Sequence, residues 1–221
     1  DSEGNIVETK DVNVNLGLIE ETLKQFIGEI TQIPPMYSAL KHNGRPLYEY
    51  ARAGIEIERP ARNVTIHSLY LDDYNPQLQQ ITFTARVSKG TYIRTLAEDI
   101  GNLLGCGASL IALRRTKTNQ FQMQDTITLD DLAAKGLDPQ QLLAVDVLTE
   151  ELKSYELTDA EFAAVKFGNI APSLQNQYPL NQEYRLYFQQ HFLGVGYFNA
   201  IENQIFLHPK RLVSGLSTLI A

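Results

Sequence analysis

The first regular pattern of apolar positions lies close to the start of the chain. Asn15 stands just before this pattern, where its side chain can accept a hydrogen bond from a free N–H of the first helical turn. The apolar residues recur at the three- and four-residue spacing of one helix face: Leu18, Ile19, Leu23, Phe26, Ile27 and Ile30. The pattern predicts an amphipathic helix that runs through Ile30, after a short strand around Ile6 and Val7.

The next stretch contains prolines and a turn signal. Pro34 and its neighbour Pro35 require an extended chain before them, because proline pushes the preceding residue out of the α region. Asn43-Gly44 predicts a tight turn. Pro46 suits the first position of a helix, so we expect a short helix over Leu47–Arg52.

Alternating apolar and polar residues follow. Residues 64–71 and 78–87 predict two strands, and the turn residues Asn75-Pro76 between them indicate an antiparallel pair with one wetted face. Thr95 with Glu98 three residues later forms a capping-box pattern, which predicts a helix that begins at about Thr95. Residues 107–116 then favour a strand, and residues 129–135 favour a short helix.

The residue composition of the chain changes near residue 157. From there to the end, short aromatic and β-branched runs alternate with glycine, asparagine and proline, which is typical of a small β-rich domain. We therefore predict two domains, residues 1–153 and residues 154–221. The overall fold class is α+β, with a mainly antiparallel sheet in the first domain.

Composition narrows the class of protein. The 221 residues suffice for one large domain or a domain with an appendage, and 43% hydrophobic with 20% charged residues is typical of a globular chain. No stretch approaches the roughly 18 apolar residues of a membrane span, so a membrane protein is excluded. The single cysteine, Cys106, excludes an intrachain disulfide and favours a reducing cytoplasm.

Positive charge is concentrated within an acidic chain. The formal net charge of the whole chain is −7, and a negative net charge argues against nucleic acid as a partner. Residues 88–117 nevertheless carry a net charge of +3, and residues 41–62 carry +2. If these segments lie side by side, they form a basic groove that also holds Tyr37, Tyr48 and Tyr92, a composition suited to structured RNA. The alternative is two solvated faces.

Tyr92 and Arg94 are the most suggestive pair for chemistry. If the chain stays extended up to Thr95, both side chains project to one side. An aromatic ring can then stack on a base while the guanidinium pairs with a carboxylate or phosphate. The alternative is a half-buried sheet tyrosine beside a surface charge. No phosphate loop is present, and the four histidines lack the spacing of a metal site.

Several motifs, in this order and spacing, closely resemble the TruB family of bacterial tRNA pseudouridine synthases. These are residues 33–41 (IPPMYSALK), residues 44–52 (GRPLYEYAR), residues 88–94 (SKGTYIR), residues 105–108 (GCGA) and residues 113–115 (LRR). The resemblance covers nearly the whole chain and is most specific from Gly28 to Thr116. Residues 192–196 and 209–212 resemble the family's small PUA-like RNA-binding domain.

The resemblance implies isomerisation of the T-loop uridine at position 55 of tRNA, with base flipping and with neither cofactor nor metal. It implies that Tyr92 stacks on the flipped base and takes part in proton transfer at C5. Arg94 would pair with the nucleophilic aspartate, and Leu113 would pack in the uridine pocket. The expected contacts with the tRNA T arm come from five basic residues: Lys41, Arg45, Lys89, Arg114 and Arg115.

One part of the family pattern is missing from this sequence. The nucleophilic aspartate belongs to a Gly-x-x-Asp-Pro-like motif upstream of the Pro-Tyr segment; Asp138 lies in such a motif but after Tyr92, in the wrong order. We therefore expect a C-terminal portion that is inactive alone, or a partner in the form of a separate N-terminal segment. The alternatives are a non-catalytic tRNA-binding or RNA-folding module, and a domain with no RNA role.

Overall fold

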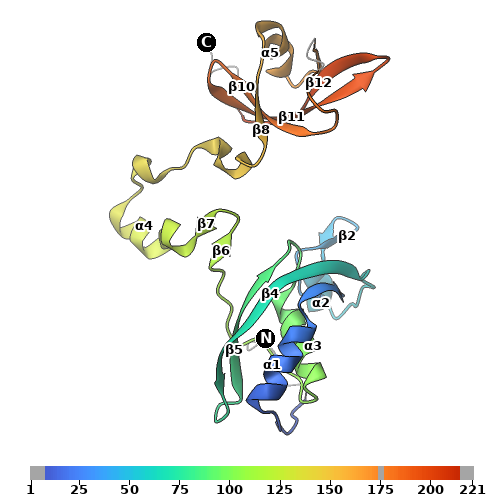
Figure 1. Cartoon of the computed structure of the whole chain (residues 1–221), viewed down its shortest axis with the longest axis vertical. Coiled ribbons are helices and arrows are strands. Elements are labelled where there is room, and N and C mark those ends of the chain that lie inside the picture. The colour runs from blue at the N-terminus through green and yellow to red at the C-terminus, as the bar shows by residue number, and fades with distance from the viewer. Residues whose placement is uncertain (1–7, 174–176, 215–221) are drawn as a thin grey trace. The chain divides into compact units, whose positions relative to one another are not determined.

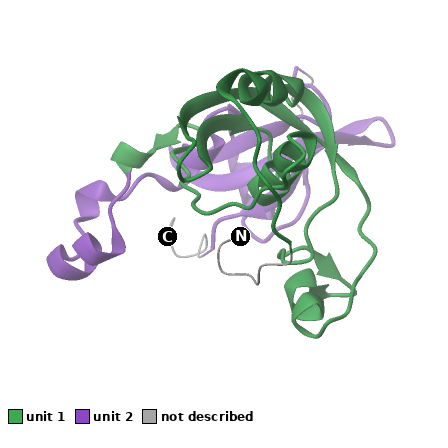
Figure 2. Cartoon of the chain, turned by 90° about the horizontal axis from the view of Figure 1, so that it is seen from below, with its two compact units in different colours: residues 1–125 green, residues 126–221 purple. Residues whose placement is uncertain are grey.

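The computed structural model describes residues 8–173 and 177–214. The predicted strand around Ile6 and Val7 lies outside the described residues. The chain divides into two compact units, residues 1–125 and residues 126–221, coloured separately in Figure 2. The domain boundary expected between residues 153 and 154 stays a prediction. Residues 126–153 belong to the second compact unit.

The first unit is built on a three-stranded antiparallel sheet in the order β1-β4-β5. Its strands are β1 (Gly28–Gln32), β4 (Arg62–Asn75) and β5 (Gln80–Val87). The predicted antiparallel pair is confirmed, because β4 and β5 pair through a long ladder. The polar face of this ladder includes a hydrogen bond of 2.7 Å from the Thr84 hydroxyl to Asp72.

Two helices pack on the sheet and close the core, as Figure 1 shows. They are α1 (Leu16–Gln25) and α3 (Ile93–Leu103). Ile66 and Leu69 of β4 turn inward to meet them; they are three residues apart because a register shift between Ile66 and Ser68 interrupts the alternation of the strand. The buried centre consists of residues from all three elements: Ile19, Leu23, Ile66, Leu69, Leu96 and Ile100.

The first helix begins as predicted and ends earlier. The Asn15 side chain accepts a hydrogen bond from Leu18 N–H at 2.9 Å, so the predicted cap is confirmed. The extension through Ile30 is wrong. Gly28 has φ +114°, which turns the chain into β1, and Ile30 pairs with Val64. Ile30 still packs against the same core, which explains why its position imitates a helical repeat.

The third helix begins two residues before the predicted start. Leu96 N–H already bonds to the carbonyl of Tyr92 at 3.0 Å, so Tyr92 is the N-cap residue. Thr95 lies inside the first turn, where it cannot cap that turn. The expected capping box is therefore wrong, and so is the extended segment that was expected to align Tyr92 with Arg94.

A small hairpin and a short helix lie between β1 and β4 in the chain. The hairpin joins β2 (Lys41–His42) to β3 (Arg45–Pro46), and the predicted turn is confirmed by left-handed φ values of 48° at Asn43 and 80° at Gly44. The predicted short helix forms as α2 (Leu47–Arg52). Pro46 is its N-cap rather than its first helical residue.

The strand predicted over residues 107–116 does not form. This segment has no regular secondary structure, and Ile111 and Leu113 are 55% and 65% exposed. A β-strand needs a neighbour to satisfy its backbone groups, and no ladder includes this segment within the described part of the chain. A two-stranded ribbon, β6 (Lys117–Thr118) with β7 (Phe121–Gln122), and a 3₁₀ turn, η1 (Met123–Asp125), follow it.

The second unit confirms the predicted β-rich character of the C-terminal part. Its sheet has the order β8-β10-β11-β12-β9, and all pairs except β8 with β10 are antiparallel. The core is strongly aromatic, and the rings of Tyr155 and Phe198 meet edge to face at 5.0 Å. The strands are β8 (Lys153–Glu156), β9 (Ala171–Pro172), β10 (Glu183–Phe188), β11 (His191–Ile201) and β12 (Gln204–Leu212).

Helices in the second unit are short. The predicted helix over residues 129–135 is confirmed as α4 (Leu129–Lys135), and α5 (Asp159–Val165) begins with a complete capping box. Two 3₁₀ turns are η2 (Pro139–Gln141) and η3 (Val145–Thr149). Asp138 caps η2, accepting the Gln140 N–H at 2.9 Å, which is an ordinary structural role for this carboxylate. No helix of the described residues has the length and apolarity to span a membrane.

Candidate active site

The site begins with a turn that delivers Tyr92 from the end of β5. Ser88 extends the ladder, since its N–H bonds to the Thr65 carbonyl at 2.8 Å and its hydroxyl accepts the Thr65 N–H at 2.9 Å. The Thr91 hydroxyl then donates to the Ser88 carbonyl at 2.9 Å. Gly90 has φ +89°, a conformation that other residues adopt only with strain. The segment SKGT is therefore a defined turn between β5 and α3.

Gln32 holds the backbone of Tyr92. Its Oε1 accepts the Tyr92 N–H at 3.0 Å, and its Nε2 donates to the Tyr92 carbonyl at 3.3 Å. Gln32 is only 2% exposed, at the end of β1. Both polar groups of the side-chain amide thus pair with one residue, in the way that a residue of a neighbouring antiparallel strand does.

Arg94 is held by the Pro-Tyr segment. Its Nη2 donates to the backbone carbonyl of Tyr37 at 2.5 Å. Arg94 lies in the first turn of α3, one residue after the start of the helix. The structure therefore brings the Tyr-Ile-Arg segment against a distant part of the sequence, the end of β1 and the Pro-Tyr segment that directly follows it.

The surroundings of Arg94 favour a negative group. Besides the guanidinium, the first turn of α3 presents backbone N–H groups, and within the described residues no side chain caps this helix. The N-terminal end of a helix carries partial positive charge. A carboxylate or phosphate placed here would interact with both sources of positive potential.

The loop that carries Leu113 is fixed to α3 at one glycine. Gly107 N–H bonds to the carbonyl of Gly101 at 2.9 Å. A Cβ at Gly101 would lie 2.2 Å from the nitrogen of Ala108, so only glycine permits this approach. Leu113 itself is 65% exposed on the segment that follows.

The predicted RNA-binding residues are all exposed and differ in their partners. The Arg45 guanidinium pairs with Glu49 at 2.7 Å and lies 4.9 Å from the centroid of the Tyr50 ring. Arg114 Nε lies 3.4 Å from the sulfur of Met123. The remaining three cations lie on the hairpin, on the turn after β5 and on the Leu113 segment: Lys41, Lys89 and Arg115. The predicted basic groove stays a prediction.

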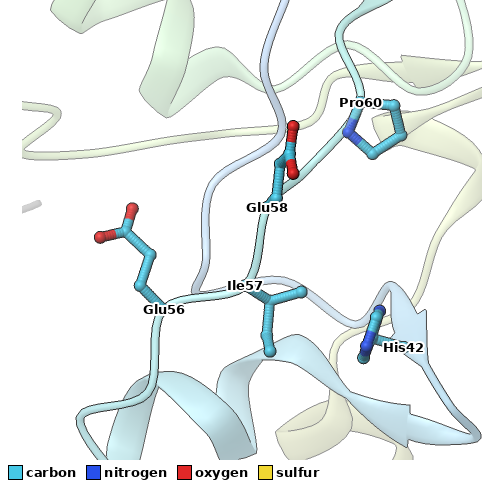
Figure 3. Close-up of a pocket in the computed structure, with 5 residues that line it drawn as sticks. All are labelled: His42, Glu56, Ile57, Glu58 and Pro60. Atoms are coloured by element: carbon cyan, nitrogen blue, oxygen red, sulfur yellow. The ribbon is translucent and has the colours of Figure 1, made fainter.

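A pocket lies next to the hairpin, and His42 of β2 contributes to its lining. It has a volume of about 460 Å³ and is shown in Figure 3. Its lining residues are His42, Glu56, Ile57, Glu58 and Pro60. The described residues contain no cluster of three His, Cys, Asp or Glu side chains that could hold a metal ion.

Sequence reasoning missed Gln32, although a signal was present. Residues 28–32 alternate between inward and outward positions, and Gln32 shares the inward face with Ile30. A polar residue at an inward position of a strand needs a buried hydrogen-bond partner. That partner, Tyr92, lies 60 residues away, so the pattern could indicate the need but not its identity.

Comparisons with known proteins agree with the motifs. Residues 1–93 match the model described as "TruB family pseudouridylate synthase (N terminal domain)", and residues 94–154 match "tRNA pseudouridylate synthase B C-terminal domain". A tRNA pseudouridine synthase B from Azoarcus sp. is 45% identical over 97% of this chain and 69% of its own length. One from Chromobacterium violaceum is 41% identical, also over 97% of this chain and 69% of its own length.

Solved structures show the same fold at low sequence identity. A Cbf5-Nop10-Gar1 complex contains a chain that is 22% identical with a TM-score of 0.64, over 90% of this chain and 62% of its own length. An H/ACA ribonucleoprotein bound to a substrate RNA contains another, 20% identical with a TM-score of 0.59 over the same shares. This chain thus spans less than two thirds of those solved chains. The motifs, the two family models and the high identity to the curated relatives show that the chain belongs to the TruB family of pseudouridylate synthases.

Proposed function

We propose that this protein supplies the uridine pocket and tRNA-binding surface for conversion of uridine 55 in the tRNA T loop to pseudouridine. The observation that carries the proposal is the joint fixing of Tyr92 and Arg94. Gln32 fixes the backbone of the first, and the Tyr37 carbonyl fixes the guanidinium of the second. Family membership and the names of the bacterial relatives support the reaction class.

The reaction is an isomerisation, so its atoms balance without a cofactor. The aspartate carboxylate attacks C1′, the bond between C1′ and N1 breaks with its electron pair leaving on the uracil, and the detached uracil rotates. A bond then forms between C1′ and C5 while the bond between C1′ and the aspartate oxygen breaks and frees the carboxylate. The proton on C5 is lost, and N1 gains one. In this scheme Tyr92 stacks on the flipped base and assists proton transfer at C5, while Leu113 contributes an apolar wall.

Arg94 is proposed to pair with the nucleophilic aspartate. A neighbouring cation typically lowers a carboxylate pKa by ~1–3 units and so keeps it ionised for attack. The uncapped first turn of α3 acts in the same direction. We propose that the aspartate comes from a Gly-x-x-Asp-Pro-like segment outside residues 1–221 and that this chain alone is inactive.

The tRNA surface is proposed to consist of the five exposed basic residues named above. They lie in two segments, residues 41–62 and 88–117, that carry net charges of +2 and +3 in a chain of net charge −7, and phosphate contacts dominate nucleic-acid affinity. Arg45 would exchange its exposed ion pair with Glu49 for a phosphate, at little cost because such pairs contribute about 0–1 kcal/mol.

The test is pseudouridine formation on an unmodified tRNA transcript in two arms. One arm uses the chain alone, and the other uses the chain fused to the part of the Azoarcus relative that this chain does not cover. We expect product at position 55 in the fused arm only. Product from the chain alone would contradict our placement of the nucleophile.

Substitutions separate catalysis from binding. Tyr92→Phe in the fused protein should reduce turnover strongly while leaving tRNA affinity unchanged, because only the hydroxyl is removed. Tyr70→Phe is the matched control, since Tyr70 is 63% exposed on β4 and belongs to no part of the proposed site. If the fused protein binds tRNA but forms no pseudouridine, the non-catalytic RNA-binding alternative is the correct one.

A further inference from the structure

We propose that Gln32 is a positioning residue for the isomerisation, acting through the backbone of Tyr92. This inference rests on the proposed function and assigns a role to a residue that neither the motifs nor the comparisons identify. The inference comes from the contacts of one buried side chain, which links the end of β1 to the start of α3.

The contact requires a side chain that carries both an acceptor and a donor. Tyr92 presents a donor and an acceptor, and the Gln32 side chain matches both at 3.0 and 3.3 Å. A carboxylate matches only the N–H, and an aliphatic side chain matches neither. Because Gln32 is only 2% exposed, solvent cannot readily substitute for a lost bond.

The contact fixes the place where strand becomes helix. Tyr92 has φ −99° and ψ 109°, and its carbonyl also accepts the first helical hydrogen bond from Leu96. These two angles orient the Cα–Cβ bond of Tyr92, from which the ring projects through its own χ1 and χ2 rotamers. Gln32 is the side chain that holds both polar groups of this residue, so it controls how the ring is presented to the base.

The same short segment also holds Arg94. Tyr37, whose carbonyl accepts a hydrogen bond from the Arg94 guanidinium, lies only five positions after Gln32. Residues 32–37 therefore contact the motif at two points, one on the tyrosine and one on the arginine. Loss of the Gln32 contact frees one end of this two-point attachment and alters the distance between the two functional side chains.

The expected effect is on turnover rather than on tRNA binding. A misplacement of about 1 Å at a reacting group can cost ~100-fold in rate. We expect Gln32→Leu in the fused, active protein to lower kcat by at least ~10-fold, with KM and tRNA affinity within about two-fold of the parent. Thr31→Val, on the same strand as Gln32, is the matched control, because it removes only the exposed hydrogen bond from the Thr31 hydroxyl to the Asn63 side chain of β4.

A second variant gives a readout that a purely structural role would not produce. In Gln32→Glu the protonated carboxyl can donate to the Tyr92 carbonyl, whereas the carboxylate faces that oxygen without a proton. Burial raises the pKa of such a carboxyl above its ordinary value. The kcat of Gln32→Glu relative to the parent should therefore fall as pH rises, with circular dichroism showing that the fold is retained.

The outcomes separate this proposal from the proposed function. If the parent forms no pseudouridine, the proposed function fails and the role of Gln32 fails with it. If the parent is active and folded Gln32→Leu retains its kcat, the positioning role alone is wrong. If Gln32→Leu does not fold, Gln32→Glu decides: a pH-independent kcat ratio overturns the proposal, and a ratio that falls with pH supports it.

Discussion

Replacement of Gly101 by alanine adds one methyl group at the contact between α3 and the loop that follows it. The added Cβ would lie 2.2 Å from the nitrogen of Ala108 and 2.3 Å from the carbonyl carbon of Gly107. Both are backbone atoms, which cannot rotate out of the way as a flexible side chain can. The loop must therefore move, and its hydrogen bond from Gly107 N–H to the Gly101 carbonyl is strained or lost.

Two opposing effects set the magnitude. Alanine is favoured over glycine in a helix interior by about 1 kcal/mol. Overpacking typically costs about 1–3 kcal/mol, and the lost hydrogen bond adds about 1 kcal/mol. We expect Gly101→Ala to destabilise the first unit by about 1–3 kcal/mol. Gly17→Ala is the matched control, because its Cβ meets only the Asn15 side chain at an ordinary 3.5 Å and should stabilise by up to about 1 kcal/mol.

The assay is hydrogen exchange read by mass spectrometry at increasing urea concentration. Peptides from β4 and β5 report on the first unit alone, which avoids mixing its unfolding with that of the second. Because the loop carries Leu113 and Arg114, tRNA turnover of the fused protein should fall with Gly101→Ala as well. A Gly101→Ala protein as stable as Gly17→Ala would refute the close approach as the reason for glycine.

Three further predictions concern stability and charge. Glu161→Ala leaves the buried Tyr155 hydroxyl without its acceptor and removes the capping box of α5. It should lower the free energy of unfolding of the second unit by about 3–5 kcal/mol, as measured by urea unfolding. Tyr155→Phe should lower this free energy much less in the Glu161→Ala protein than in the parent protein. Burial, and then the charge of Glu98, raise the pKa of Asp99 above 3.8. Asp99 therefore binds its proton more tightly in the folded than in the unfolded protein. Its ionisation lowers the free energy of unfolding progressively as pH rises from 3.8 through the raised pKa. Asp99→Asn should raise the melting temperature at pH 7 and lose this gain below pH 3.8; an equal gain at all pH values would contradict the sign. Lys89→Ala should reduce the salt dependence of tRNA binding by about one phosphate contact, a change of ~0.7–0.9 in the log–log slope, and an unchanged slope would remove Lys89 from the RNA surface.

Local signals were sufficient wherever a few neighbouring residues decide the conformation. The Asn15 cap, the Asn43-Gly44 turn and the bounds of α2 and α4 all follow from preferences within a few residues. The antiparallel pair β4–β5 was equally predictable, because its alternating pattern and short linker are local too. The family motifs predicted, by resemblance alone, that Tyr92 and Arg94 are functional residues.

Distant contacts decided the remaining elements. Residues 107–116 have a strand-like composition but belong to no described ladder, and composition cannot supply a partner. Ile30 fits a helical repeat, yet it belongs to β1, because the core accepts apolar residues from either element.

The sequence by itself determined the local elements, the charge pattern and the family motifs of this protein. Only the tertiary structure decided how those motifs meet. Tyr92 is the N-cap of α3, and Gln32, 60 residues earlier, pairs with its backbone, while Arg94 donates to the Tyr37 carbonyl. The physical reason is that a buried polar side chain must find a hydrogen-bond partner wherever the fold places one, and sequence spacing does not encode that place.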